Sequence, residues 1–378
     1  MAKKTESSSV FWQKITKYSK KYISCSLKRW LIGVFIIVLT IVPRFWRLNF
    51  PPTPYFDEPY HLGAVRLIAR HDSRAYEWWH QLINNQGEID AGDAFQSHDW
   101  LHPPVAKLIQ AVSINWFQDN AWGWRLPPAV AGSLLIGACY LLAKQIARNW
   151  FDSPDLIETT AALSCLLMAF DGLVLVQSRI MMNDIFMCLW LVLMMYFLSR
   201  WQPEIWSLQF VHQRRLKKFC GLTNAENLIV AGLFLGLAVA TKWSALFPAG
   251  FFFLLVVFLA FQANSKKILP LIIFSLVGLP IAIYIFSYGQ MFAQGKNLND
   301  WWQLHQQIWW YQTHRQEGHI YASKPFEWLF NLRPVWYWTD TKLQMSQAQV
   351  SSSTDTSAAN IYALGNPLLH TIGLFALV

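Results

Sequence analysis

The segment PPTPYFDEPYH (residues 51–61) follows the first long apolar run of the chain and contains two adjacent carboxylates, Asp57 and Glu58. Acidic side chains beside a membrane span are costly and are more often functional than structural. A carboxylate placed there can accept a proton from an attacking hydroxyl group. Alternatively, the two residues cap the helix that follows and pair with Arg66 or Arg70. The local sequence is compatible with both interpretations.

The composition around this segment is typical of a membrane protein. Of the 378 residues, 54% are hydrophobic and only 14% are charged, whereas about a quarter are charged in soluble domains. Several apolar runs approach the roughly 20 residues needed to cross a bilayer. The formal net charge of +9 comes from basic residues that cluster beside these runs, which favours positive-inside topology over nucleic-acid binding. The sequence therefore predicts an all-α polytopic membrane protein.

The distribution of Lys and Arg predicts the topology. The basic tail, residues 1–29, is placed in the cytoplasm, so the first span ends outside. A seven-span core, residues 30–288, includes a first extracytoplasmic loop with amphipathic helices, residues 51–124, and the second such loop covers residues 289–364. Residues 365–378 begin an eighth apolar run that is shorter than a span, so a truncated chain or a fragment is expected. The predicted spans are 30–50, 125–147, 157–176, 180–198, 227–240, 245–261 and 268–288.

Three cations lie at the predicted outer ends of different spans: Arg125, Arg179 and Lys242. The positive-inside bias disfavours cations on that side. Their convergence predicts a site for a lipid-linked phosphate. The alternative is that each side chain extends separately to the lipid headgroups.

The first extracytoplasmic loop contains a second candidate, His102-Pro103-Pro104 followed by Lys107. A helix starting at the proline pair would point free N–H groups outward and favour an anion such as phosphate. An ordinary loop-to-helix junction is the alternative. His98, Asp99 and His102 could also bind a metal, although no partner cluster has a recognised ligand spacing.

Two further acidic residues, Asp171 and Asp184, flank Gln177 and Arg179. A charge inside an apolar run costs several kcal/mol, on the order of 3, if it is left unpaired. We therefore expect structural ion pairs, with Arg179 or another cation as the partner of Asp171. The Trp-rich stretch 301–310 could stack on sugar or peptide, or form an interfacial aromatic belt.

The order of these motifs resembles that of the protein O-mannosyltransferases, membrane enzymes of the GT-C glycosyltransferase superfamily. The resemblance covers nearly all of residues 40–378. It rests on the following motifs: Asp57-Glu58, His102-Pro103-Pro104 with Lys107, Arg125-Leu126-Pro127, Arg179 with Asp184, Ala240-Thr241-Lys242-Trp243, Leu332-Arg333-Pro334 and Gly365-Asn366-Pro367.

The resemblance implies an inverting GT-C enzyme that transfers mannose from a polyprenyl phosphate to a Ser or Thr hydroxyl of a secreted or membrane protein, without a divalent metal or other cofactor. It implies that Asp57 is the base and that Glu58 organises the site. Arg125 and Lys242, with Gln177 or Arg179, would bind the donor phosphate. The segment His102-Pro103-Pro104 with Lys107 would shape the donor pocket.

Other functions remain open at this stage. A related GT-C enzyme could move another sugar, such as aminoarabinose, to a lipid acceptor. A transporter of lipid-linked glycans would carry its polar groups near the bilayer midplane with internal repeats, whereas this sequence places most of them at one rim and shows no internal repeat. An inactive, truncated paralogue is a further possibility. We expect a multi-pass protein, in a bacterial plasma membrane rather than the endoplasmic reticulum, with its site on the extracytoplasmic side and no nucleic-acid partner.

Overall fold

The computed structural model describes residues 33–34, 37–78, 99–202 and 224–314, together with 323–324, 326–327, 330–339, 360–367, 369 and 373. The chain divides into two units, Met1–Pro43 and Arg44–Val378. In the first unit, residues 37–43 are helical. The second unit contains the rest of the described structure and all of the candidate site residues.

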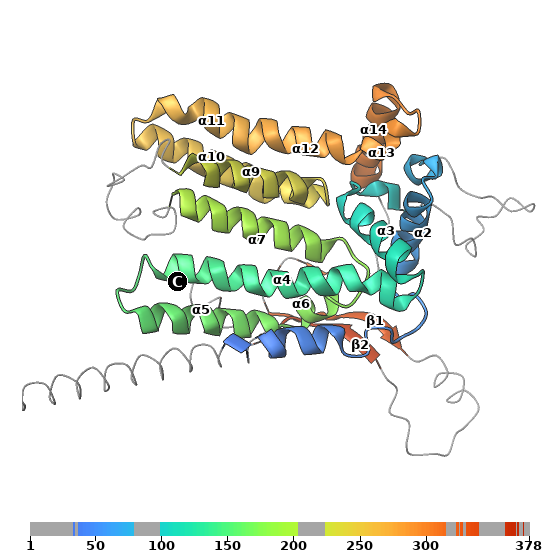
Figure 1. Cartoon of the computed structure of the whole chain (residues 1–378), viewed down its shortest axis with the longest axis horizontal. Helices are drawn as coiled ribbons and strands as arrows, with labels where there is room; N and C mark the ends of the chain where they lie inside the picture. Colours follow the sequence, from blue (N-terminus) through green and yellow to red (C-terminus); the bar gives the residue numbers. More distant parts are fainter. Residues whose placement is uncertain are drawn as a thin grey trace, which may run out of the picture. The chain divides into compact units, whose positions relative to one another are not determined.

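Apolar helices lying side by side form the main layer of the second unit (Figure 1). Among the described residues, four helical stretches are long and apolar enough to cross a membrane: Ala121–Ala147, Asp184–Trp201, Trp243–Gln262 and Lys266–Ser287. The expectation of an all-α polytopic membrane fold is therefore confirmed. The elements of this layer are α4 (Ala121–Ala147), α5 (Pro154–Ala169), α7 (Asp184–Trp201), α9 (Ala225–Val239), α10 (Leu246–Gln262), α11 (Leu269–Ile273) and α12 (Leu279–Ser287).

Close approach between α9 and the last helical stretch depends on a glycine. A β-carbon at Gly232 would lie 1.8 Å from the carbonyl oxygen of Ser275, so only a residue without a side chain fits there. Ser275 belongs to a π-helical turn, Phe274–Gly278, that joins α11 to α12. Small residues at helix contacts are the usual way for membrane helices to pack without a hydrophobic driving force.

The third predicted span, 157–176, is wrong as a single helix. Helix α5 ends at Ala169, and a short helix α6 (Gly172–Gln177) follows. The break occurs because Asp171 is the N-cap of α6, where its carboxylate accepts a hydrogen bond from the backbone N–H of Val174 at 2.8 Å. A capping carboxylate satisfies helix N–H groups that have no partner inside the helix.

Shorter elements gather at one end of the helical layer (Figure 1). There α2 (Glu58–Ala69), α3 (Val105–Phe117) and α14 (Leu298–His314) share a core with Tyr288, which follows α12. The antiparallel strands β1 (Val335–Thr339) and β2 (Asn360–Ala363) pair with an irregular register between Trp336 and Trp338. Both strands pack near the segment that precedes α2. This end of the layer contains the candidate site.

Candidate active site

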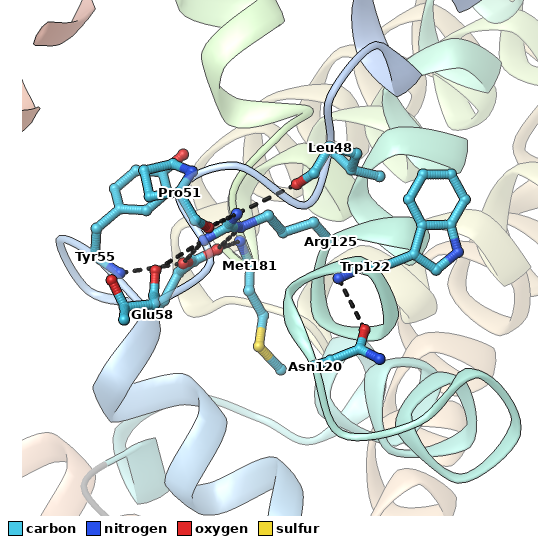
Figure 2. A network of polar contacts seen from close by, with 9 residues as sticks. Leu48, Pro51, Tyr55, Glu58, Asn120, Trp122, Arg125 and Met181 are labelled. Carbon is cyan, nitrogen blue, oxygen red and sulfur yellow. Dashed lines mark hydrogen bonds and ion pairs between the residues drawn. The ribbon is translucent and has the colours of Figure 1, made fainter. Parts of the chain in front are cut away.

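Glu58 forms a buried ion pair with Arg125, and neither side chain has any exposed surface. The Arg125 Nε donates to Glu58 Oε1 at 2.8 Å, and its Nη2 donates to Oε2 at 2.7 Å (Figure 2). The backbone N–H groups of Tyr55 and Met181 donate to the same carboxylate at 3.2 and 3.0 Å. A buried carboxylate is stable only when it is paired and hydrogen-bonded in this way.

The remaining donors of Arg125 hold the loop that leads into α2. Its Nη1 donates to the carbonyl oxygens of Leu48 and Pro51 at 3.2 and 2.6 Å, and its Nη2 donates to that of Thr53 at 3.2 Å. A guanidinium has five N–H donors, and five hydrogen bonds account for them. All five N–H donors of Arg125 are therefore engaged in this structure and its side chain is buried, and its expected role in binding the donor phosphate stays a prediction. Arg125 positions Glu58 and the loop that leads into α2.

The carboxylate of Asp57 differs from that of Glu58 in its burial and hydrogen bonding. It is the N-cap residue of α2, but its side chain makes no capping hydrogen bond. Within the described part of the chain, no hydrogen bond or ion pair engages its half-buried carboxylate. Burial raises the pKa of this carboxyl group above its ordinary value, and the positive charges of His61 and Lys242 partly oppose that rise. Asp57 is thus an available carboxylate with increased basicity.

The residue before Asp57 is held by an aromatic contact. Phe56 has a φ of +55°, a left-handed conformation that costs about 1–2 kcal/mol for a non-glycine residue. Its ring stacks on Tyr337 of β1 with the centroids 3.9 Å apart and the planes at 11°. Gln177 Nε2 donates to the hydroxyl of the same tyrosine at 2.7 Å. Gln177 is therefore engaged in placing the segment ahead of Asp57.

Lys242 and Asp184 form a second, more accessible ion pair. The Lys242 Nζ lies 2.7 Å from Asp184 Oδ1, and the two side chains are 26% and 30% exposed. Lys242 follows the end of α9, and Asp184 begins α7. Both charges act on the carboxyl group of Asp57. Partly exposed pairs of this kind exchange partners at little cost.

The ion pair expected for Asp171 is replaced by backbone hydrogen bonds. Besides capping α6, the carboxylate accepts a bond from the backbone N–H of Asn366 at 2.8 Å. Among the described residues, no cation pairs with it. Arg179 instead donates from Nη2 to the carbonyl oxygen of Arg47 at 3.5 Å. Two directed N–H donors thus satisfy this buried carboxylate with charge-assisted hydrogen bonds.

A buried ionic cluster that the sequence analysis missed lies behind this site. His61 Nδ1 contacts Asp99 Oδ2 at 2.7 Å. Lys107 donates to the carbonyl oxygen of Asp99 and, at 2.7 Å, to that of His102. Lys107 is 2% exposed, and the expectation that it lines the donor pocket stays a prediction. The signal in the sequence was weak, because 38 residues separate His61 from Asp99.

The proline pair joins this cluster to the helical layer. Pro103 and Pro104 are buried, and the backbone N–H of Val105 donates to the carbonyl oxygen of Ala240 at 3.0 Å. His102 is partly exposed, and burial lowers its pKa to about 4. The loop therefore presents a neutral imidazole three residues before Val105, which is bonded to Ala240.

The described residues contain no group of three or more His, Cys, Asp or Glu side chains arranged to hold a metal ion. The rings of His61 and His102 lie 6.3 Å apart. His98, the third member of the metal-site alternative, lies outside the described residues.

Comparison with known proteins identifies the family. The family model described as dolichyl-phosphate-mannose-protein mannosyltransferase matches residues 34–293. This chain belongs to that family. A second model, described as the C-terminal four-TMM region of protein-O-mannosyltransferase, matches residues 297–378. Together the two matches cover both the helical layer and the part that contains β1 and β2.

Individual relatives agree with this assignment. A polyprenol-phosphate-mannose–protein mannosyltransferase of Mycolicibacterium smegmatis is 26% identical over 83% of this chain and 64% of its own length. Its counterpart in Corynebacterium glutamicum is 25% identical over 88% of this chain and 68% of its own length. The present chain therefore spans less than two thirds of the length of the M. smegmatis relative.

Among solved structures, the S. cerevisiae protein O-mannosyltransferase Pmt1-Pmt2 complex bound to the sugar donor has a similar fold. The TM-score is 0.52 and the sequence identity 17%, over 71% of this chain and 34% of the yeast chain. The polytopic all-α fold is thus of the GT-C type.

Proposed function

We propose that this protein is an inverting glycosyltransferase that moves mannose from a polyprenyl phosphate to a Ser or Thr hydroxyl group of a protein. The available carboxylate of Asp57, beside the exchangeable Lys242–Asp184 pair, is the observation that carries this proposal. The names of the mycobacterial and corynebacterial relatives support the donor and the protein acceptor.

In this proposal, Asp57 is the general base. The acceptor oxygen attacks the anomeric carbon of mannose, its proton passes to the Asp57 carboxylate, and the bond from that carbon to the phosphate oxygen breaks. The configuration inverts because attack and departure occur on opposite faces of the sugar. Burial raises the pKa of Asp57, and a base whose pKa lies closer to the working pH removes a proton more efficiently. Glu58 supports this step by fixing the start of α2.

Lys242 is the cation we propose for the donor phosphate. The leaving polyprenyl phosphate gains negative charge as the glycosidic bond breaks, so a fixed cation stabilises the transition state more than the ground state. The Lys242 ammonium is partly exposed and its described contact is Asp184, so it can turn to a phosphate. We propose Arg179 and Gln177 as further donors at this site, and His102 with its two prolines as one wall of the donor pocket.

We further propose that the site faces the extracytoplasmic side of a bacterial plasma membrane. Asp57 and Lys242, together with the start of α7, lie at one end of the helical layer. The basic residues of the sequence 1–29 favour a cytoplasmic tail, and the first predicted span, 30–50, then leads to an extracytoplasmic segment 51–61. Bacterial relatives favour the plasma membrane.

The direct test is a transfer assay on membranes that contain the chain. Radiolabelled polyprenyl-phosphate mannose and a Ser/Thr-rich peptide are incubated with the wild type and with Asp57→Asn, in the presence and absence of a chelator. We expect labelled peptide from the wild type only, at the same rate in both conditions. No transfer to peptide, combined with transfer to lipid, would instead favour the aminoarabinose-type alternative. Activity lost with the chelator would contradict the metal-independent mechanism.

A further inference from the structure

The buried cluster behind Asp57 contains one carboxylate and two basic side chains. Asp99 Oδ2 lies 2.7 Å from His61 Nδ1 and 3.8 Å from the Lys107 Nζ. The three residues are 3%, 6% and 2% exposed. Asn183 Nδ2 donates to the same Asp99 oxygen at 3.4 Å. Asn183 directly precedes Asp184, so the cluster reaches the residue that pairs with Lys242.

Burial and hydrogen bonding determine the charge of this cluster. Burial alone would raise the pKa of Asp99, but Lys107 and His61 hold it well below its ordinary value. Burial alone would lower the pKa of His61, but the Asp99 carboxylate raises it. The Lys107 ammonium supplies the second positive charge and also donates to two backbone carbonyls. An isolated charge in such a site would be very costly, so the cluster is stable only as a paired set.

His61 connects the cluster to Asp57. It lies one helical turn after Asp57 on α2, and its backbone N–H donates to the Asp57 carbonyl oxygen at 3.3 Å. The charged and titratable groups that act on Asp57 come from several elements: His61, Lys242, Asp184, Asp99 and Tyr337. Those that act on His61 are Asp99, Asp57, Lys107 and His102. Among the charges around Asp57, His61 has the largest effect.

We propose that His61, held in its orientation by Asp99, is a positioning residue that fixes the first turn of α2 and keeps the Asp57 carboxylate ionised. It does not need to touch the substrate. The positive charge of His61, paired with Asp99, lies one helical turn from the base, which must remain deprotonated until the acceptor hydroxyl attacks. This proposal rests on the proposed function, because it assigns a supporting role to the same base.

A purely structural role for the cluster makes a different prediction. If His61 only filled space, its replacement would lower the transfer rate by the same factor at every pH. If its charge keeps Asp57 ionised, a neutral replacement raises the Asp57 pKa, and activity is lost mainly on the acidic side. The shape of the pH profile does not depend on how much folded protein is present, so it separates the two roles.

The test measures kcat/KM against pH in membranes for the wild type, His61→Gln, His61→Lys and Arg66→Gln. Arg66 is the matched control, since it lies on the same helix but pairs at the surface with Asp119 at 2.8 Å. We expect the acidic limb of the His61→Gln profile to move to higher pH by about one unit. Below that limb kcat/KM should fall about tenfold, and above it kcat/KM should recover. The limbs of His61→Lys and Arg66→Gln should stay close to that of the wild type.

Two results would overturn the inference: an unmoved limb in His61→Gln, or an equal shift in His61→Lys. If His61→Gln does not accumulate in membranes, Asp99→Asn provides the second route. Without its partner, buried His61 loses its proton, and the limb should move in the same direction by a smaller amount, because Asp99 itself raises the Asp57 pKa. If the acidic limb of the Asp99→Asn profile does not move, the inference is also overturned. A wild-type chain without any mannosyl transfer would instead contradict the proposed function.

Discussion

The carboxylate of Glu58 and the guanidinium of Arg125 form a bidentate ion pair with no exposed surface, although 67 residues separate them in the sequence. The same arginine binds three backbone carbonyls of the loop between residues 48 and 53. The pair therefore joins the start of α4 to the start of α2. It leaves the neighbouring Asp57 at the edge of the site, where its carboxylate is available for chemistry.

Arg125→Lys should destabilise the protein rather than weaken the donor selectively. A lysine cannot satisfy both oxygens of Glu58 and the three carbonyl groups, so we expect a loss of about 3 kcal/mol or more, as for other broken buried pairs. Thermal unfolding in detergent measures this loss. Arg148→Lys is the control, because Arg148 lies near the far end of α4 and bonds only to Gln145 among its described side-chain contacts. A stable Arg125→Lys protein with weakened donor binding would restore the phosphate-ligand interpretation.

Asp57→Asn should lower the transfer rate by roughly 10²–10⁴-fold, the usual contribution of a general base. The fold should be unaffected, because the side chain makes no capping bond. Glu58→Gln should instead lower the stability of the fold more than the transfer rate, since it disrupts the buried pair with Arg125. Single-turnover transfer and thermal unfolding, measured on both variants, separate the two roles. Near-normal transfer by Asp57→Asn would remove Asp57 from the mechanism.

Lys242→Gln should raise the KM for the polyprenyl-phosphate donor by about tenfold, corresponding to the loss of roughly one charge-assisted hydrogen bond. Lys144→Gln is a matched control. Lys144 pairs with Glu158 at 2.9 Å with similar exposure, but it lies near the C-terminal end of α4 rather than at the site. Donor titrations at saturating peptide measure the difference. An equal effect of both variants would point to general membrane electrostatics instead of a phosphate contact.

The pH dependence of wild-type activity follows from the burial of Asp57. Asp57 must be ionised to act as a base, and burial raises its pKa above the ordinary value of about 3.9. Activity should therefore fall as the pH drops through that raised pKa, at higher pH than for an exposed carboxylate.

Protonation of Asp57 has opposite effects on stability and on activity. The folded state favours protonated Asp57, so this group stabilises the fold below its unfolded pKa, and that contribution is lost as the pH rises through the raised pKa. Thermal unfolding of the wild type and Asp57→Asn across the acidic range measures the difference, and a flat difference would contradict the raised pKa.

The sequence by itself determined the class of the protein and pointed to its candidate site. Apolar runs predicted the membrane helices, except that the run 157–176 is broken at Asp171, and Pro103-Pro104 predicted the start of α3, which begins at Val105. The acidic pair at residues 57–58 indicated the site. These features could be read because they depend on local composition, periodicity and charge asymmetry.

Only the tertiary structure decided which partner each charge finds. Arg125 binds Glu58, Asp171 caps α6 instead of pairing with a cation, and His61 contacts Asp99. The partners of the two long-range pairs lie 67 and 38 residues apart. Which groups are buried together depends on how the helices pack, and a buried charge takes whatever donors that packing supplies. No local pattern in the sequence carries that information.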